Sequence, residues 1–262
     1  MNGADTIRKN IDLLSEQTKT HRTVIEAQLE EAVRCLKGHG PADSADFFRR
    51  AFSKEPLCGD FLYISSKLVS SQNIYKKAKE VCKIACTKSP VFYSAVRKLC
   101  SFAGTIRILE ESDFRACCES VQIGNTDYCI LPLSSSVDGY YPTFSKLLKA
   151  YDLKICKVIS HTRQDSDEEL QLALLSRELE IQNGAENISF SFTDGQEYPL
   201  SATVSALSDR GIRIKSINSS PLEYSIDSCE HRITAELSGF SPAALLYFLE
   251  AALPGHTVLG IY

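Results

Sequence analysis

Cationic side chains recur along the N-terminal part of the chain, at places that suit an anionic ligand. Arg8, Arg22 and Lys37 lie on or near the apolar stripe of a long predicted helix, and Asp46 and Arg49 follow after a turn. These groups could neutralise a dianion or line an anion pocket. The alternative is structural: the cations extend into water from a helix edge, and the turn residues form a solvated face.

Three consecutive serines, Ser134, Ser135 and Ser136, follow a predicted buried strand. Their hydroxyls and the amides at the start of the next helix could bind a carboxylate, or the serines could form a polar turn between strand and helix. Residues 218–221 could contact an effector, or form a bulged strand end. The five histidines are scattered, and the sequence predicts no Ser-His-Asp or Cys-His constellation.

Composition limits the classes of function. The 262 residues are 44% hydrophobic and 24% charged, with a net charge of −4, which is typical of a globular protein and disfavours a nucleic-acid partner. No apolar run approaches the ~20 residues of a membrane span, and the polar N-terminus lacks a signal peptide, so we expect a cytoplasmic protein without a membrane partner. Cys82, Cys86, Cys117 and Cys118 are expected as small buried hydrophobes, with no metal site or cofactor.

Residues 1–86 are predicted to be helical. One apolar stripe recurs at three- and four-residue steps, and it comprises Ile7, Ile11, Leu14, Thr18, Ile25, Leu29, Val33 and Leu36. A later helix is expected to carry on one face Phe61, Ile64, Leu68, Ser71, Tyr75, Ala78, Cys82 and Ala85. A stripe of this length needs a partner, either by folding back or by forming a homodimer.

The rest of the chain alternates between strands and helices. Residues 87–180 read as an α/β segment, in which Tyr128–Leu133 suits a parallel strand buried on both faces. Residues 185–262 read as βαββαβ, a ferredoxin-like order, with Ser241 and Pro242 opening the second helix. The predicted fold class is therefore α+β multidomain, in three successive segments.

Residues 128–160 resemble the core of prephenate dehydratases, where a buried strand ends in Pro-Ile-Glu-Asn-Ser/Thr and a Gly follows. Pro132 and Gly139 match this pattern, while serines replace Glu-Asn. The resemblance implies a truncated dehydratase-like lobe, because only nine residues separate Ser160 from Leu170, where the family has a second lobe.

The last dehydratase strand of the family begins with Thr-Arg-Phe, and here those positions are Leu170, Gln171 and Leu172. The resemblance implies that the family's threonine helps to position a proton donor for the departing hydroxyl of prephenate. Leucine cannot donate a proton.

The C-terminal segment resembles the phenylalanine-binding ACT domain of the same family. Its closing Leu-Gly-x-Tyr is Leu259-Gly260-Ile261-Tyr262. The two motifs that the resemblance implies for effector binding fall on Tyr198, Pro199, Leu200, Asn218, Ser219, Ser220 and Pro221. They replace Gly-Ala-Leu and Glu-Ser-Arg-Pro, so the amino acid that they would bind stays open.

The helical front is similar to the chorismate mutase domain of the bifunctional enzymes. The resemblance implies a catalytic set of Arg8, Arg22, Lys37, Asp46, Arg49 and Ser71. Chorismate rearranges without acid, base or nucleophile, on preorganised cations. The family's central arginine is Glu26 here, and Arg22 lies one turn earlier.

Together these likenesses point to a degenerate relative of bifunctional chorismate mutase–prephenate dehydratases. Two functions stay open. The chain could be an enzyme of L-phenylalanine biosynthesis, a mutase or a dehydratase, with eroded sites and an amino-acid-sensing ACT domain. It could instead be a catalytically silent regulatory or assembly protein that binds an amino acid. Either way, we expect an aromatic amino acid, prephenate or chorismate as the ligand, no cofactor, and a homodimer.

Overall fold

The computed structural model describes residues 3–41, 43–44, 47, 59–69, 81–101, 103–162, 167–182, 184–195, 199–222, 228–237, 239–253 and 255–262. In residues 3–22 the described side chains are those of Leu13, Glu16, Gln17 and Thr20. The chain divides into two compact units. We call them the helical unit (Met1–Gln72, Gln196–Gly211 and Ala243–Pro254) and the sheet unit (Asn73–Gly195, Ile212–Pro242 and Gly255–Tyr262).

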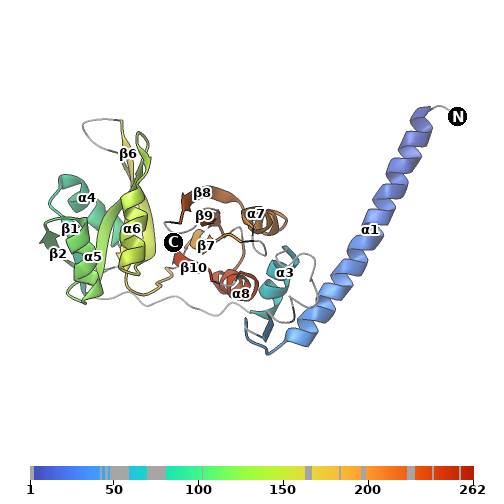
Figure 1. Ribbon diagram of the computed structural model, residues 1–262, viewed down its shortest axis with the longest axis horizontal. Coiled ribbons are helices and arrows are strands. Elements are labelled where there is room, and N and C mark those ends of the chain that lie inside the picture. Colours follow the sequence, from blue (N-terminus) through green and yellow to red (C-terminus); the bar gives the residue numbers. More distant parts are fainter. Residues whose placement is uncertain are drawn as a thin grey trace. The chain divides into compact units, whose positions relative to one another are not determined.

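The helical unit contains α1 (Gly3–Leu36), α3 (Gly59–Leu68), α7 (Leu200–Ser208) and nearly all of α8 (Pro242–Ala252) (Figure 1). On α1, Leu29 and Leu36 are buried, whereas Ile25 is 46% exposed. The hydroxyl of Tyr63 on α3 donates to Glu30 Oε1 of α1 at 3.1 Å. The predicted stripe of α1 is therefore covered at its C-terminal end and open around Ile25.

The sheet unit is built on one ten-stranded mixed sheet in the order β2-β1-β3-β6-β5-β10-β7-β9-β8, with β4 paired to β3. Its described elements are β1 (Val81–Thr87), α4 (Pro90–Leu99), β2 (Thr105–Glu111), α5 (Phe114–Gln122), β3 (Tyr128–Ser135), β4 (Gly139–Tyr140), α6 (Pro142–Ala150), β5 (Lys154–Thr162), β6 (Glu169–Ser176), β7 (Asn187–Thr193), β8 (Ile214–Pro221), β9 (Cys229–Glu236) and β10 (Thr257–Ile261). No helix in the described part of the chain is long and apolar enough to cross a membrane.

Strand β1 corrects one sequence prediction. Cys82 and Ala85 were expected on the face of a helix, but they lie in a strand that pairs with β2 and β3. Cys82, Ile84 and Cys86 pack on the α4 side of the sheet, and Ala85 packs on the opposite side. The misreading arose because a short apolar run fits both the helical and the strand period. The helical segment therefore ends before Val81.

The first six strands have a core on each face. Apolar side chains of α4 pack with one cluster, and those of α5 and α6 pack with the other. Strand β3 runs parallel to β1 but antiparallel to β6, so the expectation of a parallel strand holds on one side alone. This two-sided burial explains why its sequence is an unbroken apolar run.

The C-terminal strands are antiparallel to one another in the order β10-β7-β9-β8. Along the chain they alternate with α7 and α8 in the predicted βαββαβ order. Strand β10 also pairs in parallel with β5, through Gly260 and Ile155. A Cβ at position 260 would lie 2.3 Å from the carbonyl oxygen of Ile155, so the join requires glycine.

Candidate functional site

The sheet unit contains a cavity of about 700 Å³, a size typical of sites for small molecules. Strands β3 to β6 contribute part of its wall, and β8, β9, residues 182–187 and Tyr262 contribute the rest. The wall therefore combines the dehydratase-like strands with the C-terminal strands. Four charged side chains line it, and three of them are cationic: Lys157, Lys215 and Arg232, with Glu186 the acid.

Arg232, on β9, is the buried charge of this wall, with 6% of its surface exposed. Its Nη1 donates to the hydroxyl of Tyr140. Its guanidinium carbon lies 5.2 Å from the ring centroid of Tyr140 and 5.3 Å from that of Phe144. Burial raises the pKa of Tyr140, although Arg232 opposes the shift, so the phenol is protonated at neutral pH.

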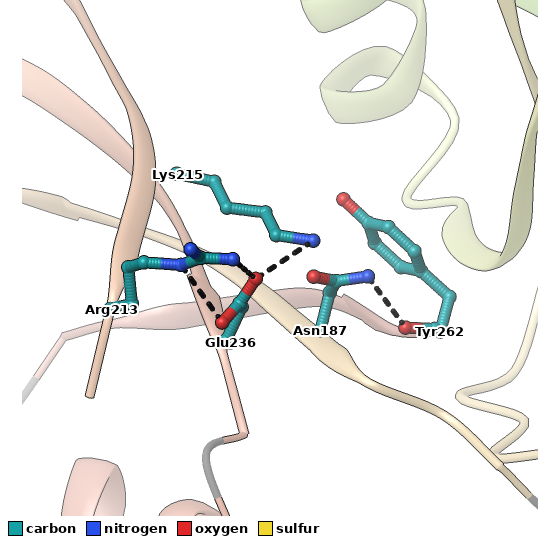
Figure 2. A network of polar contacts seen from close by, with 5 residues as sticks. All are labelled: Asn187, Arg213, Lys215, Glu236 and Tyr262. Carbon is teal, nitrogen blue, oxygen red and sulfur yellow. Dashed lines mark hydrogen bonds and ion pairs between the residues drawn. The ribbon is translucent and has the colours of Figure 1, made fainter. Parts of the chain in front are cut away.

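No carboxylate among the described residues forms an ion pair with Arg232. Glu230, two residues earlier on the same strand, pairs with Lys149 at 3.2 Å. Glu236 pairs with Arg213 and, at 3.4 Å, with Lys215, as Figure 2 shows. These two cations, Arg213 first, hold the pKa of Glu236 below its ordinary value.

Asn187, the first residue of β7, and Tyr262 both line the cavity and are hydrogen-bonded to each other. The backbone N–H of Asn187 donates to the carbonyl oxygen of Tyr262 at 2.7 Å, and its Nδ2 donates to the same oxygen at 3.3 Å (Figure 2). The Oδ1 of Asn187 is buried and has no hydrogen-bond partner in the described part of the chain. This acceptor of Asn187 is enclosed by protein atoms and is not exposed to the cavity.

Two of the predicted serines line the cavity, Ser134 and Ser135. Ser134 Oγ donates to Gln171 Oε1 at 3.2 Å, and Ser135 Oγ accepts the backbone N–H of Asp138 at 2.8 Å. Ser136 lies outside the lining, and its Oγ accepts the N–H of Glu169 at 3.0 Å.

The serines lead into a hairpin rather than directly into a helix, because β4 pairs back onto β3. Gly139 makes this turn with φ of 74°, a conformation that favours glycine. The expected helix N-terminal amides therefore do not follow the serines directly, and the hydroxyl of Ser135 fixes the hairpin turn instead.

Leu170 belongs to the core and not to the cavity. It is 9% exposed and packs in the same cluster as Leu172, while Gln171 between them lines the cavity. The position at which the resemblance implies a threonine thus carries no proton donor and faces apolar side chains.

The predicted effector residues 218–221 divide between the two faces of β8. Asn218 lines the cavity, whereas Ser219 contacts His231. Ser220 and Pro221 are exposed. Pro199 precedes α7 and Leu200 is its first residue, in the helical unit; Tyr198 lies outside the described residues.

Of the predicted mutase residues, Lys37 alone has a described side chain, so their arrangement stays a prediction. Lys37 is exposed directly after α1. Arg8 and Arg22 are described as backbone of α1 alone. Asp46, Arg49 and Ser71 lie outside the described residues.

The structure corrects the expectation that no Ser-His-Asp constellation exists. Ser219 Oγ lies 2.8 Å from Nδ1 of His231, and Nε2 of the same ring lies 3.1 Å from Asp194 Oδ2. The second contact lies within ion-pair distance, although Nε2 makes no hydrogen bond within the described part of the chain. The sequence signal was weak, because it depends on pairing Ser219 with His231 across two strands.

Buried thiols behave as predicted. Cys82, Cys86, Cys117 and Cys118 are fully buried, and burial raises the pKa of Cys117 to about 12. Among the described residues, no group of three or more His, Cys, Asp or Glu could hold a metal ion.

Comparisons with known proteins support the fold. No protein-family model matches the sequence, and no curated protein matches it significantly. Three solved structures with similar folds are GqqA, described as a novel type of quorum-quenching acylase (18% identity, TM-score 0.55, 70% of this chain and 94% of that one), prephenate dehydratase from Streptococcus mutans (18%, 0.56, 69% and 97%) and prephenate dehydratase from Staphylococcus aureus (10%, 0.52, 69% and 99%). The chain therefore has a prephenate dehydratase-like fold.

Proposed function

We propose that this chain is a prephenate dehydratase-like protein of L-phenylalanine biosynthesis in which the catalytic sites are eroded and an ACT domain senses an amino acid. The ACT domain corresponds to residues 185–262, the dehydratase-like lobe precedes it from β1 onward, and the N-terminal helices are mutase-like. The strand order β10-β7-β9-β8, with its βαββαβ chain order, supports the assignment of the C-terminal segment.

The observation on which the proposal rests is the place of Leu170. Loss of water from prephenate requires a positioned proton donor. In this chain the position matched to the family's threonine holds a leucine packed in the core, while the neighbouring cavity persists. A cavity without this proton donor is better suited to binding a ligand than to converting prephenate.

The test is to mix the purified protein with prephenate, and separately with chorismate, and to follow each compound spectroscopically. We expect neither to be consumed, and consumption of prephenate would overturn the proposal. Melting temperatures measured with L-phenylalanine, L-tyrosine and L-tryptophan test the sensor. A ligand at 100 times its Kd stabilises the folded state by about 2.7 kcal/mol, so the absence of a shift with all three contradicts amino-acid sensing.

A second candidate is hydrolysis of an acyl bond. One of the similar structures is described as an acylase, and Ser219, His231 and Asp194 provide a nucleophile, a base and a carboxylate in contact. Incubation with a fluorophosphonate probe distinguishes the candidates. Labelling of Ser219 that is lost in His231→Ala would favour hydrolysis, and unlabelled protein would exclude it.

We further propose that the protein forms a homodimer along α1. Leu13, Val24 and Ile25 are 58%, 52% and 46% exposed, although they lie on a helix whose C-terminal end is buried. Exposed apolar side chains along one helix favour burial against a partner helix. Light scattering after size exclusion measures the mass, and a monomer at micromolar concentration would refute the pairing.

A further inference from the structure

We propose that the cavity of the sheet unit is an amino-acid site in which Arg232 binds the ligand's carboxylate. The ligand would then be held by a single chain rather than between two paired C-terminal segments. This inference rests on the proposed function in one respect, namely that the ligand is an amino acid. The part played by Arg232 stands on the geometry of the cavity.

The first argument is the burial of an incompletely paired charge. An arginine stays protonated in proteins, and a buried cation without an anion is costly. Arg232 is 6% exposed, yet Tyr140 is its one hydrogen-bond acceptor among the described residues. The ring faces of Tyr140 and Phe144 stabilise the cation but use none of the remaining N–H donors. Those donors suit an anion that enters the cavity.

The second argument concerns the neighbouring charges. Two carboxylates on the same strand as Arg232 are paired with other cations, Glu230 with Lys149 and Glu236 with Arg213 and Lys215. The ammonium of Lys157 is bonded to the carbonyl of Lys98 and to Ser101, each at 3.2 Å. Arg232 is thus the buried cation of the wall without an anionic partner in the described structure.

The third argument gives the chemical class of the ligand. A guanidinium presents its donors as a planar fork that matches a carboxylate in two parallel hydrogen bonds. The same wall carries the carboxylate of Glu186, which accepts hydrogen bonds from an ammonium group. A cavity of about 700 Å³ with cationic and accepting groups suits a small zwitterion.

Successive residues of β8 face opposite sides of the sheet, and one of these sides lines the cavity. Asn218 lines the cavity, while Ser219 is directed to His231 on the other face. Replacing Asn218 by aspartate would place a negative charge on the wall that already holds the ligand's carboxylate, and would weaken binding by repulsion. Changes at Ser219 should leave the cavity unaltered.

The test is isothermal titration calorimetry with L-phenylalanine, L-phenylalaninamide, phenylpyruvate and inorganic phosphate. We compare the unaltered protein with Arg232→Met, Arg232→Lys, Asn218→Asp and the control Arg107→Gln, an exposed arginine on β2 outside the cavity lining. L-Phenylalanine is expected to bind, the amide at least tenfold more weakly, and Arg232→Met about 10- to 100-fold more weakly. Arg107→Gln should bind as the unaltered protein does. Circular dichroism checks that each variant is folded. If Arg232→Met does not fold, the affinities of Arg232→Lys and Asn218→Asp for L-phenylalanine test the proposal instead.

The outcomes separate the two proposals. Equal affinity for L-phenylalanine in Arg232→Met and the unaltered protein would overturn the role of Arg232 and leave amino-acid sensing intact. Binding of phenylpyruvate but not L-phenylalanine, with loss in Arg232→Met, would retain the carboxylate site and refute amino-acid sensing. Tighter binding of phosphate than of either carboxylate overturns the ligand class, and binding of none of the probes overturns both proposals.

Discussion

The Cα of Gly260 approaches Ile155 so closely that a Cβ would lie 2.3 Å from the Ile155 carbonyl oxygen and 2.6 Å from its Cβ. This contact joins β10 to β5, and with it the two halves of the sheet. Contacts of this kind cannot be relieved by a side-chain rotation, because one partner is backbone.

Gly260→Ala should therefore destabilise the protein by about 1–3 kcal/mol, the range of an overpacked core, with loss of folding at the upper limit. Urea unfolding followed by circular dichroism measures the change. Gly195→Ala is the matched control, since a Cβ there meets nothing within 4 Å, and it should stay within about 0.5 kcal/mol. Equal stability of the two variants would show that the strands can separate without cost.

Tyr128 and Glu180 form a buried hydrogen bond, with the phenol donating to Oε2 at 2.7 Å. Burial, followed by this bond, raises the pKa of Tyr128 far above its usual range, so the phenol stays a donor at every accessible pH. Tyr128→Phe should lower stability by about 1–3 kcal/mol, because a buried carboxylate loses a partner. Tyr93→Phe is the control, since its bond to Glu110 is exposed. A cost in Tyr128→Phe no larger than in the control would contradict the prediction.

Asp194 gives a prediction for the dependence of stability on pH. The backbone N–H of Cys229 first, and then His231, hold the pKa of Asp194 below its ordinary value of 3.8. A carboxyl with a lowered folded-state pKa stabilises the native state above its unfolded value and loses that contribution as pH falls through the folded value.

Asp194→Asn should therefore be less stable than the unaltered protein by about 1 kcal/mol at pH 7 and at pH 5, with the gap narrowing below about pH 4. Urea titrations at pH 7, 5 and 3 provide the measurement. Asp167→Asn, at an exposed position, serves as the control. A gap that is constant over these three pH values would show that the carboxylate does not act through its charge.

The described cysteines should differ sharply in reactivity. Cys35 is exposed on α1, whereas Cys100 and Cys117 are fully buried and burial raises the pKa of each to about 12. The thiolate is the reactive form, so a maleimide should label Cys35 in the native protein and reach Cys100 and Cys117 on unfolding alone. Peptide mass spectrometry before and after unfolding in urea identifies which cysteines are labelled. Native labelling of Cys117 would show that this core opens.

Part of this architecture could be predicted because each element carries its own local signal. Pro242 begins α8 as expected, and β7 and β9 form where apolar and polar residue types alternate in the sequence, although burial does not alternate along either strand. The prediction for β1 was wrong because Cys82 and Ala85 also fit one face of a helix. Pairing with β2 and β3 makes this segment a strand, and those partners are distant in the sequence.

The candidate site was harder to predict. Ser134, Ser135 and Asn218 were proposed as binding residues and do line the cavity. Arg232 was missed, because what marks it is burial against Tyr140 on another strand, and nothing in its neighbouring sequence reports that contact. The contact between Ser219 and His231 depends on strand register, which the sequence leaves open.

The absence of a side chain at Gly260 has a mechanical consequence. At Gly260 the backbones of β10 and β5 are in direct contact, so no side chain separates the C-terminal strands from the dehydratase-like strands there. The two sets of strands therefore cannot shift past each other by side-chain rearrangement. A hinge between them would have to break a main-chain pair before it could open. Because these strands form one hydrogen-bonded sheet, a distortion of the cavity wall around Arg232 would extend along the strands. Entry of a ligand into the cavity would therefore depend on movement of its side chains and loops.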